Sequence, residues 1–408
     1  MQIEAKQRLD RLLGWCLLLP LRPLVRLVGR LARRDHGTEP AGEVVVVKML
    51  GGGSLLLALP ALLGLRRRHP RLPLTIVCGG SVRPFAETLG LFDRIEVVDD
   101  RRGLAGLLWS GGRVLASLLR RRVDTVLDLE IYSVLSTVFS SLTCARNRIG
   151  FYLENTYWRR NLHTHLVFFN RSAGVFHFYD AAVRLLGAEP ASMEECRLHL
   201  TGRLDRSRGG SGAWAIPGLK GDEPFTAVGA GCSDLGQVRQ MPVGEWRVFA
   251  RRRPDGLSGN PWVFLGGPDD REVSEAVARA VGQELGDSFR WTNLCGQLPL
   301  ESSLAVLRCA HRFVGIDSAL LHAARLLRVP SVSFWGATAP ATRLRPVEGL
   351  EEEIHYRPPI CSPCIHVAET PPCKGNNVCM QLFTRDEPAF VLWCEDSTGA
   401  SVCPPVTG

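Results

Sequence analysis

Short apolar runs alternate with longer helical segments along most of the sequence, and this alternation limits the possible folds more than any other feature. The first run, Val44–Val47, is four consecutive valines. Such a continuous β-branched run is typical of a strand buried on both faces of a parallel sheet. Similar runs lie at 74–78, 95–98 and 125–129, with helical segments between them. The pattern predicts a doubly wound α/β domain.

A second alternating set begins at Phe225, after a stretch rich in Gly, Ser, Arg and Pro that we interpret as a linker. A length of 408 residues also suggests two or three domains. We therefore predict five parts: a basic amphipathic segment at 1–40, a Rossmann-like domain at 41–205, a linker at 206–224, a Rossmann-like domain at 225–345 and a Pro- and Cys-rich tail at 346–408.

The N-terminal segment is basic and amphipathic, with an arginine at every fourth position over residues 22–30. Its apolar stretch at 12–21 is shorter than the roughly 20 residues of a membrane span, and acidic residues near its start argue against a signal peptide. Two interpretations remain open: a helix in the interface of an anionic membrane, or a helix packed on the protein. Pro20 and Pro23 predict two short helices rather than one.

The charge balance favours anionic partners. Lys and Arg number 49 and Asp and Glu number 41, which gives a net charge of +8. Nucleotide sugars, phosphorylated glycolipids, an acidic membrane face and nucleic acid all fit such a surplus. The arginines are scattered and no nucleic-acid-binding motif is present, so we expect no nucleic-acid partner. Thirteen cysteines in a long chain fit a reduced, cytoplasmic protein.

Two loops that follow predicted strands suit an anion-binding cleft. Gly51, Gly52 and Gly53 come after the first strand, where glycines let the backbone approach a ligand closely. After the strand at 312–316, Ser318 and His322 lie one helical turn apart, at a helix start whose free amides could hold a pyrophosphate. Each loop also has a plainer interpretation, as a tight turn and as an N-cap with a packed histidine.

Taken in order, the motifs resemble those of glycosyltransferase family 9, the family of bacterial ADP-heptose:lipopolysaccharide heptosyltransferases. The matching segments are Val47–Leu62, Asp128–Glu130, Arg148–Phe151, Leu265–Asp270, Leu294–Gly296, Asp317–His322, Phe334–Pro340 and Cys361–Met380. The resemblance implies a GT-B fold, in which an acceptor domain and a donor-binding domain face each other across a cleft. It also implies a nucleotide-diphosphate sugar donor, no cofactor and no need for a metal.

The resemblance places the donor site in the second domain. The family's D-S-G-x-x-H-like segment corresponds to Asp317, Ser318, Ala319 and His322, with alanine in place of glycine. Arg239 stands where the family has a lysine that contacts the donor phosphate, and arginine can pair with phosphate as well. Cys232 and Ser233 match small polar residues near the phosphates, and Asp270 aligns with the acid after paired glycines.

Ser54 departs from the family pattern, which has an aspartate there as the proposed catalytic base. A serine does not act as a base at neutral pH without an activator, and an inverting transfer needs a carboxylate or histidine near the acceptor hydroxyl. Three interpretations are open: the base has moved to Glu130, the acceptor is acidic, or the protein binds without turnover. We favour Glu130 as the base, although a carboxylate that only stabilises the N-terminus of the next helix would give the same sequence pattern. We expect Asp128 to be held by hydrogen bonds.

The tail carries four cysteines in the pattern C-x2-C-x8-C-x5-C: Cys361, Cys364, Cys373 and Cys379. A C-x2-C pair is a common zinc half-site, but the second half lacks one. We favour reduced thiols in a loop over a zinc site. The aromatic and basic residues at 151–171 could line the acceptor side of the cleft or form an ordinary surface loop.

These observations predict a cytoplasmic glycosyltransferase, peripheral on the inner face of the plasma membrane if its N-terminal segment docks there. We expect it to transfer heptose from ADP-heptose to a glycolipid or another cell-envelope acceptor. The alternatives are a transferase with another nucleotide sugar and a soluble or natural-product acceptor, and a catalytically degenerate protein that binds sugar nucleotides.

Overall fold

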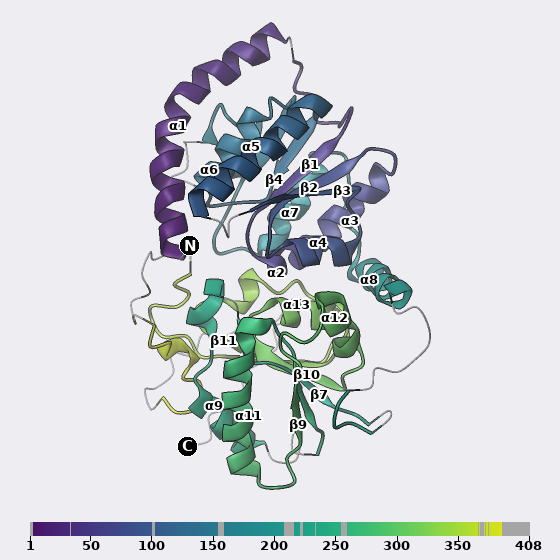
Figure 1. Ribbon diagram of the computed structural model, residues 1–408, viewed down its shortest axis with the longest axis vertical. Coiled ribbons are helices and arrows are strands. Elements are labelled where there is room, and N and C mark those ends of the chain that lie inside the picture. The colour runs from purple at the N-terminus through teal and green to yellow at the C-terminus, as the bar shows by residue number, and fades with distance from the viewer. Residues whose placement is uncertain are drawn as a thin grey trace.

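The structure, a computed structural model, describes residues 3–385 apart from short gaps. The gaps are residues 33, 100–102, 154–158, 208–215, 221–222, 233, 254–258, 366, 368–370, 372 and 374. Two α/β domains lie one above the other, and a long N-terminal helix runs along the side of the first (Figure 1).

The first domain is built on a six-stranded parallel sheet in the order β3-β2-β1-β4-β5-β6. Its strands are β1 (Val44–Lys48), β2 (Leu74–Gly79), β3 (Arg94–Val98), β4 (Thr125–Asp128), β5 (Asn147–Tyr152) and β6 (His165–Phe168). Its helices are α2 (Gly52–Leu57), α3 (Leu59–Arg68), α4 (Arg83–Leu89), α5 (Gly103–Arg121), α6 (Val134–Leu142), α7 (Val175–Arg184) and α8 (Met193–Ser207).

The valines of β1 explain why this strand is central. Val44 and Val46 belong to the hydrophobic core that α2, α3, α4 and α7 cover, whereas Val45 and Val47 pack with residues of α5 on the other face. Because neighbouring strand residues point to opposite faces, a continuous apolar run fills both layers.

The second domain is built on another six-stranded parallel sheet, in the order β12-β11-β10-β7-β8-β9. Its strands are β7 (Thr226–Gly229), β8 (Trp262–Phe264), β9 (Trp291–Asn293), β10 (Arg312–Ile316), β11 (Ser331–Trp335) and β12 (Glu352–Tyr356). Its helices are η2 (Asp234–Arg239), α9 (Val243–Arg252), η3 (Pro268–Asp270), α11 (Arg271–Leu285), α12 (Leu300–Arg308), α13 (Ala319–Leu326), η4 (Pro340–Thr342) and η5 (Val378–Met380).

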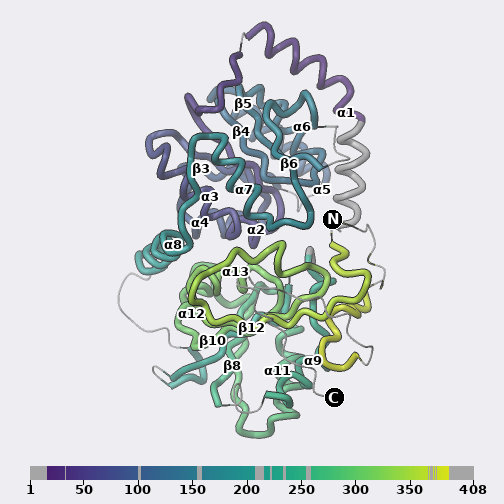
Figure 2. The backbone as a smooth tube through the Cα atoms, turned by 180° about the vertical axis from the view of Figure 1, so that it is seen from behind, coloured from purple at the N-terminus to yellow at the C-terminus, as the bar shows by residue number. Residues whose placement is uncertain are grey.

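The two sheets confirm the predicted α/β fold of two Rossmann-like, doubly wound domains. The strand β12 lies inside the segment interpreted as a tail, so the second sheet extends beyond residue 345. Seen from behind, α8 lies beside both domains, and it contacts α4 in the first and α12 and α13 in the second (Figure 2).

The N-terminal segment forms one helix, α1 (Ile3–Leu31), with Pro20 and Pro23 inside it, so the prediction of two short helices is wrong. The helix bends along its course (Figure 1). Leu18 and Leu21, on either side of Pro20, are buried in a cluster with α6. This packing offsets the local cost of the prolines, which sequence alone does not reveal. Among the helices of the described chain, none is both long and apolar enough to cross a bilayer.

Candidate active site

The two loops singled out in the sequence meet where the domains face each other. Helix α2 begins in the glycine loop after β1 and packs against α13 of the second domain. A Cβ atom placed on Gly53 would lie 3.3 Å from both Ala319 Cα and His322 Cδ2. The absence of a side chain at Gly53 therefore allows the close approach of α2 to α13.

The structure also explains why glycine suits the two preceding positions, 51 and 52. Gly51 has φ +81°, in the left-handed region, and it directly precedes α2. A Cβ atom on Gly52 would lie 2.1 Å from the ring of Phe85. The triple glycine thus fits both a turn and tight packing, and it brings the end of β1 to the interface between the domains.

Glu130 follows β4 at the same edge of the sheet, and three donors hold one of its carboxylate oxygens. Its Oε1 accepts from Lys48 Nζ at 3.0 Å, from the Met49 amide at 2.7 Å and from the Leu50 amide at 3.0 Å. Burial alone would lower the pKa of Lys48, but the Glu130 carboxylate raises that pKa above its ordinary value. Lys48 is therefore a buried cation that fixes Glu130 in place.

The second oxygen of Glu130, Oε2, makes no hydrogen bond to any residue of the described chain, and the side chain is 13% exposed. Asp128, by contrast, is fully buried. It accepts from the Glu130 amide at 3.0 Å and from Ser136 Oγ at 3.0 Å. Of these two acids, only Glu130 thus offers an oxygen to a ligand.

Ser54 lies at the start of α2, next to the glycine loop. Its side chain lies near the phenol of Tyr179, a buried residue of α7. Burial raises the pKa of Tyr179, so the phenol stays protonated at neutral pH. The side chain beside Ser54 is thus a neutral phenol rather than a carboxylate or an imidazole, and such a neighbour does not make the serine a base.

Asp317 is the centre of the polar cluster in the second domain. Its Oδ2 accepts from Thr338 Oγ1 at 2.6 Å and from Arg239 Nη1 at 3.3 Å. His322 Nε2 lies 3.3 Å from Oδ1. Burial would raise the pKa of Asp317, but Arg239 and His322 hold it far below its usual range. The ionised, 2% exposed carboxylate therefore orients its neighbours more than it contacts a ligand.

Polar atoms without partners surround Asp317. Within the described chain, Arg239 Nε, Ser318 Oγ and His322 Nδ1 are buried and have no hydrogen-bond partner. Ser318 directly precedes α13 and does not cap it with its side chain. An unsatisfied buried polar atom costs about 1–3 kcal/mol. The cluster therefore suits a polar ligand that would supply the missing bonds.

Asp270 lies in η3 after β8, close to two glycines. Its Oδ2 accepts from the Gly267 amide at 2.8 Å, and a Cβ atom on Gly231 would lie 2.3 Å from its Oδ1. Burial raises the pKa of Asp270. Cys232, next in the chain to Gly231, donates to the carbonyl of Gly236. Ser233 lies outside the described residues.

Sequence reasoning missed three residues of this region: Lys48, Thr338 and Arg343. Arg343 follows η4, and its charge lowers the pKa values of both Asp317 and Tyr179, which belong to different domains. It forms no ion pair with any described residue. The first two lie in matched motifs, but their contacts depend on the tertiary fold, and nothing distinguishes Arg343 from the chain's other arginines.

The two remaining clusters from the sequence are the aromatic and basic segment at 151–171 and the cysteine tail. Arg159 is buried and donates to the carbonyls of Phe151 at 3.1 Å and Ser133 at 3.0 Å. Residues 154–158 of the same segment lie outside the described chain. In the tail, burial and, to a smaller extent, the charges of Cys364, Cys373 and Cys361 raise the pKa of Cys379 to about 12. No group of three or more His, Cys, Asp or Glu among the described residues is placed to hold a metal ion.

Comparisons with known proteins bear on the family and the fold. A sequence model of glycosyltransferase family 9 (heptosyltransferase) matches residues 247–373. A search of curated proteins finds no match. A solved family 9 glycosyl transferase from Veillonella parvula is similar, with 19% identity and a TM-score of 0.59 over 81% of this chain and 90% of that one.

Two Escherichia coli structures are also similar. Heptosyltransferase WaaC with ADP shares 17% identity and a TM-score of 0.56 over 76% of this chain and 92% of that one. ADP-heptose lps heptosyltransferase II shares 16% identity and a TM-score of 0.53 over the same shares. At such identities these similarities establish the fold.

The architecture and the facing loops define a two-domain protein of the GT-B class. Within that class, and with the match in its second domain, the chain resembles glycosyltransferase family 9, as its motifs predicted.

Proposed function

We propose that the protein is a glycosyltransferase that transfers heptose from ADP-heptose to a lipid- or cell-envelope-linked acceptor. The observation that carries the proposal is the cluster around Asp317, which gathers Arg239, Ser318 and His322 opposite the glycine loop. Residues 247–373, which include much of this cluster, match the heptosyltransferase family. A protein of the same fold, WaaC, has been solved with ADP.

In this proposal the donor diphosphate lies at the amino end of α13. Arg239 pairs with a phosphate, and Arg343, which forms no ion pair within the described chain, supplies a second cation. The free amides at the start of α13 add donors of the same polarity. Such fixed positive groups stabilise the charge that develops on a departing diphosphate, so the proposed reaction needs no metal.

Glu130 is the proposed base. The acceptor oxygen bonds to the anomeric carbon of the sugar, and the bond from that carbon to the phosphate oxygen breaks. The hydroxyl proton passes to Glu130 Oε2, and the nucleoside diphosphate leaves with the electron pair. The clamp of Lys48 and two amides on Oε1 holds the carboxylate so that Oε2 faces the acceptor.

A second candidate is a protein that binds a sugar nucleotide without turnover. It is favoured by Ser54, which stands where the family has an aspartate and lies near the neutral phenol of Tyr179. Incubation with a panel of nucleotide sugars, followed by mass spectrometry, separates the two. Release of nucleoside diphosphate supports the transferase and identifies the donor; binding without release supports the second candidate. Release from a donor other than ADP-heptose would retain the transferase and overturn the heptose assignment.

We also propose that the protein is cytoplasmic and docks on an anionic membrane through α1. Three leucines on one face of this helix, Leu24, Leu27 and Leu31, are each more than half exposed. Arg26 and Arg30 lie beside them and are exposed too. This is the arrangement of a helix that inserts its apolar face into a membrane interface, with arginines toward lipid phosphates.

A further inference from the structure

A basic cavity lies behind α1, on the side of the first domain where β5 and β6 begin. It measures about 420 Å³. Its walls are the second half of α1, the end of α6 and the loops before β5 and β6. The basic residues that line it are Arg26, Arg30, Arg34, His36, Arg148 and His163, and no aspartate or glutamate of the described chain lines it. We refer to it as the α1 cavity.

Three of the arginines come from one stripe of the N-terminal segment. Arg26 and Arg30 are four residues apart on α1, so they lie on one face of this helix, and Arg34 lies three residues beyond its end. Arg34 donates to the carbonyl of Cys144. Arg26 and Arg30 form no ion pair with a residue of the described chain. Two exposed guanidinium groups at the mouth of the cavity are therefore available to an anion.

Arg148 lies deeper and has no counterion. It is 5% exposed, and it donates to the carbonyls of Leu162 at 2.7 Å and of Ala145. Burial and the neighbouring charge of Arg34 lower its pKa to about 10, which leaves it a cation at neutral pH. No carboxylate of the described chain pairs with it. A buried cation without a counterion is costly, and an anion in the cavity would remove that cost.

His163 forms part of the wall and has a vacant nitrogen. Its side chain is fully buried, and Nε2 lies 3.4 Å from Asp128 Oδ2. Its Nδ1 has no hydrogen-bond partner within the described part of the chain. Burial lowers the pKa of His163. An anion in the cavity would favour the imidazolium, whose two N–H groups could then donate to Asp128 and to the anion.

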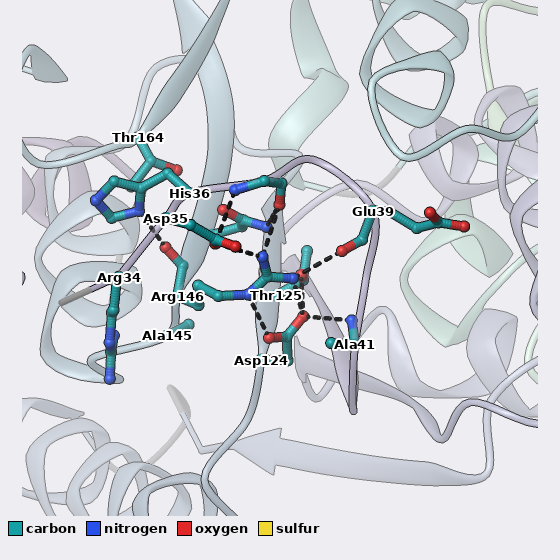
Figure 3. A network of polar contacts seen from close by, with 12 residues as sticks. Arg34, Asp35, His36, Glu39, Ala41, Asp124, Thr125, Ala145, Arg146 and Thr164 are labelled. Atoms are coloured by element: carbon teal, nitrogen blue, oxygen red, sulfur yellow. Dashed lines mark hydrogen bonds and ion pairs between the residues drawn. The ribbon is translucent and has the colours of Figure 1, made fainter. Parts of the chain in front are cut away.

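A network of polar contacts fixes the segment that follows α1 (Figure 3). Arg146 bonds to Asp35 at 2.9 Å and to Asp124 at 2.8 Å, and it also donates to the carbonyls of Gly37 at 3.0 Å and Glu39 at 2.7 Å. The network has two consequences. It holds Arg34 and His36 against the cavity, and it pairs Asp35 and Asp124 with Arg146, so these two acids do not compete for the cavity's cations.

We propose that the α1 cavity binds the phosphate of an anionic phospholipid headgroup. The charge of the cavity selects a phosphate. Leu24, Leu27 and Leu31 are not among the residues that line the cavity, but Arg26 and Arg30, which line it, lie on the flank of α1 next to these leucines, so a headgroup from a membrane on the leucine face would meet these two arginines first. The headgroup enters between the arginines of α1 and Arg148 while Leu24, Leu27 and Leu31 contact the acyl region. This site rests on the proposed membrane docking and is independent of the proposed sugar transfer.

Co-sedimentation of the full chain with vesicles tests the site. Phosphatidylglycerol mixed with phosphatidylcholine is compared with phosphatidylcholine alone. Arg30→Glu, an exposed change, should weaken binding to the anionic vesicles about tenfold or more, as expected for losing a charge-assisted contact. Arg148→Gln should weaken this binding to a similar extent, provided that a thermal unfolding measurement shows the variant to be folded. The matched control is Arg279→Glu, which makes the same charge reversal on α11, where the side chain is 70% exposed.

If Arg30→Glu and Arg279→Glu lose vesicle binding equally, the protein is attracted by its net charge alone, and the proposed site is overturned. Wild-type binding by Arg30→Glu would overturn the site and leave membrane docking intact. Calorimetry with glycerol 1-phosphate tests whether the cavity binds a soluble phosphate compound instead of a lipid. An affinity for glycerol 1-phosphate comparable with that for the vesicles would overturn the lipid assignment. ADP binding is measured on the same variants and should not change, so a failure of the donor site is recognised separately.

Discussion

Glu130 and Asp128 show how two acids two residues apart acquire different surroundings. Asp128 ends β4 and is enclosed by Ser136, His163 and the Glu130 amide. Glu130 lies two residues beyond the end of the strand and keeps one oxygen for a ligand. Placing Glu130 at this edge of the sheet was possible from the sequence, because strand ends can be located by pattern. The clamp from Lys48 was not, because it joins residues 82 positions apart.

The first prediction concerns this carboxylate. Glu130→Gln should keep nucleotide diphosphate affinity and lose turnover by about a hundredfold or more, because the amide cannot accept the acceptor's proton. Ser54→Ala, as the control, should change turnover little. Because Glu130→Gln also leaves Lys48 buried without its counterion, thermal unfolding must accompany the rate measurement. Full activity in a folded Glu130→Gln protein would remove this residue from the mechanism.

A second prediction follows from Asp317. Its pKa is lowered in the folded protein by Arg239 and His322, relative to about 3.9 in an unfolded chain. A lowered pKa contributes stability that is present above the unfolded value and is lost as the pH falls below about 4. The free energy of unfolding should therefore decline in acid, and less steeply in Asp317→Asn. Urea unfolding over a pH series measures both slopes, and identical slopes would contradict this account of Asp317.

At the scale of elements, α1 has two different faces. Leu18 and Leu21 pack with Val134, Val138 and Leu162, whereas Leu24, Leu27 and Leu31 are exposed. The sequence left a packed helix and a membrane helix as alternatives, and the structure shows that packing and exposure coexist along the same helix. Its prolines led to the wrong prediction of a break, because local propensity does not include the packing on α6.

A third prediction separates these faces. Changing Leu24, Leu27 and Leu31 together to Gln should abolish co-sedimentation with anionic vesicles and leave the melting temperature almost unchanged. Leu18→Ala should instead lower the free energy of unfolding by about 2–5 kcal/mol, because it opens a cavity against α6. Retained vesicle binding in the triple variant would contradict the membrane role of the exposed face.

At the scale of the whole molecule, two similar domains meet through polar as well as apolar contacts. Arg345 of the second domain pairs with Asp180 of the first at 2.8 Å, and its guanidinium lies 4.7 Å from the ring centre of Phe176. The sequence predicted both domains, because the central buried strands of each sheet have a local apolar signature. It did not predict β12, an edge strand with charged residues and only partly buried side chains, which lacks that signature.

The interface between the domains was predictable only in part. The glycine loop and the segment from Asp317 to His322 were located by motif, and the fold brings them together. Arg343 and Tyr179 could not be located, because their positions depend on how one domain sits on the other. The closeness of Gly53 to α13 likewise follows from the packing of two elements that are more than 250 residues apart.

The central claim is that a nucleoside diphosphate binds at this interface through Arg239, and calorimetric titration with ADP tests it most directly. Wild type should bind, and Arg239→Ala should bind about tenfold more weakly or worse, because a charge-assisted phosphate contact is lost. The control Arg251→Ala removes an arginine that pairs with Glu284 on the surface at 2.6 Å, and it should bind as wild type does. Equal affinity in wild type and a folded Arg239→Ala protein, or no binding of ADP by wild type, would contradict the claim.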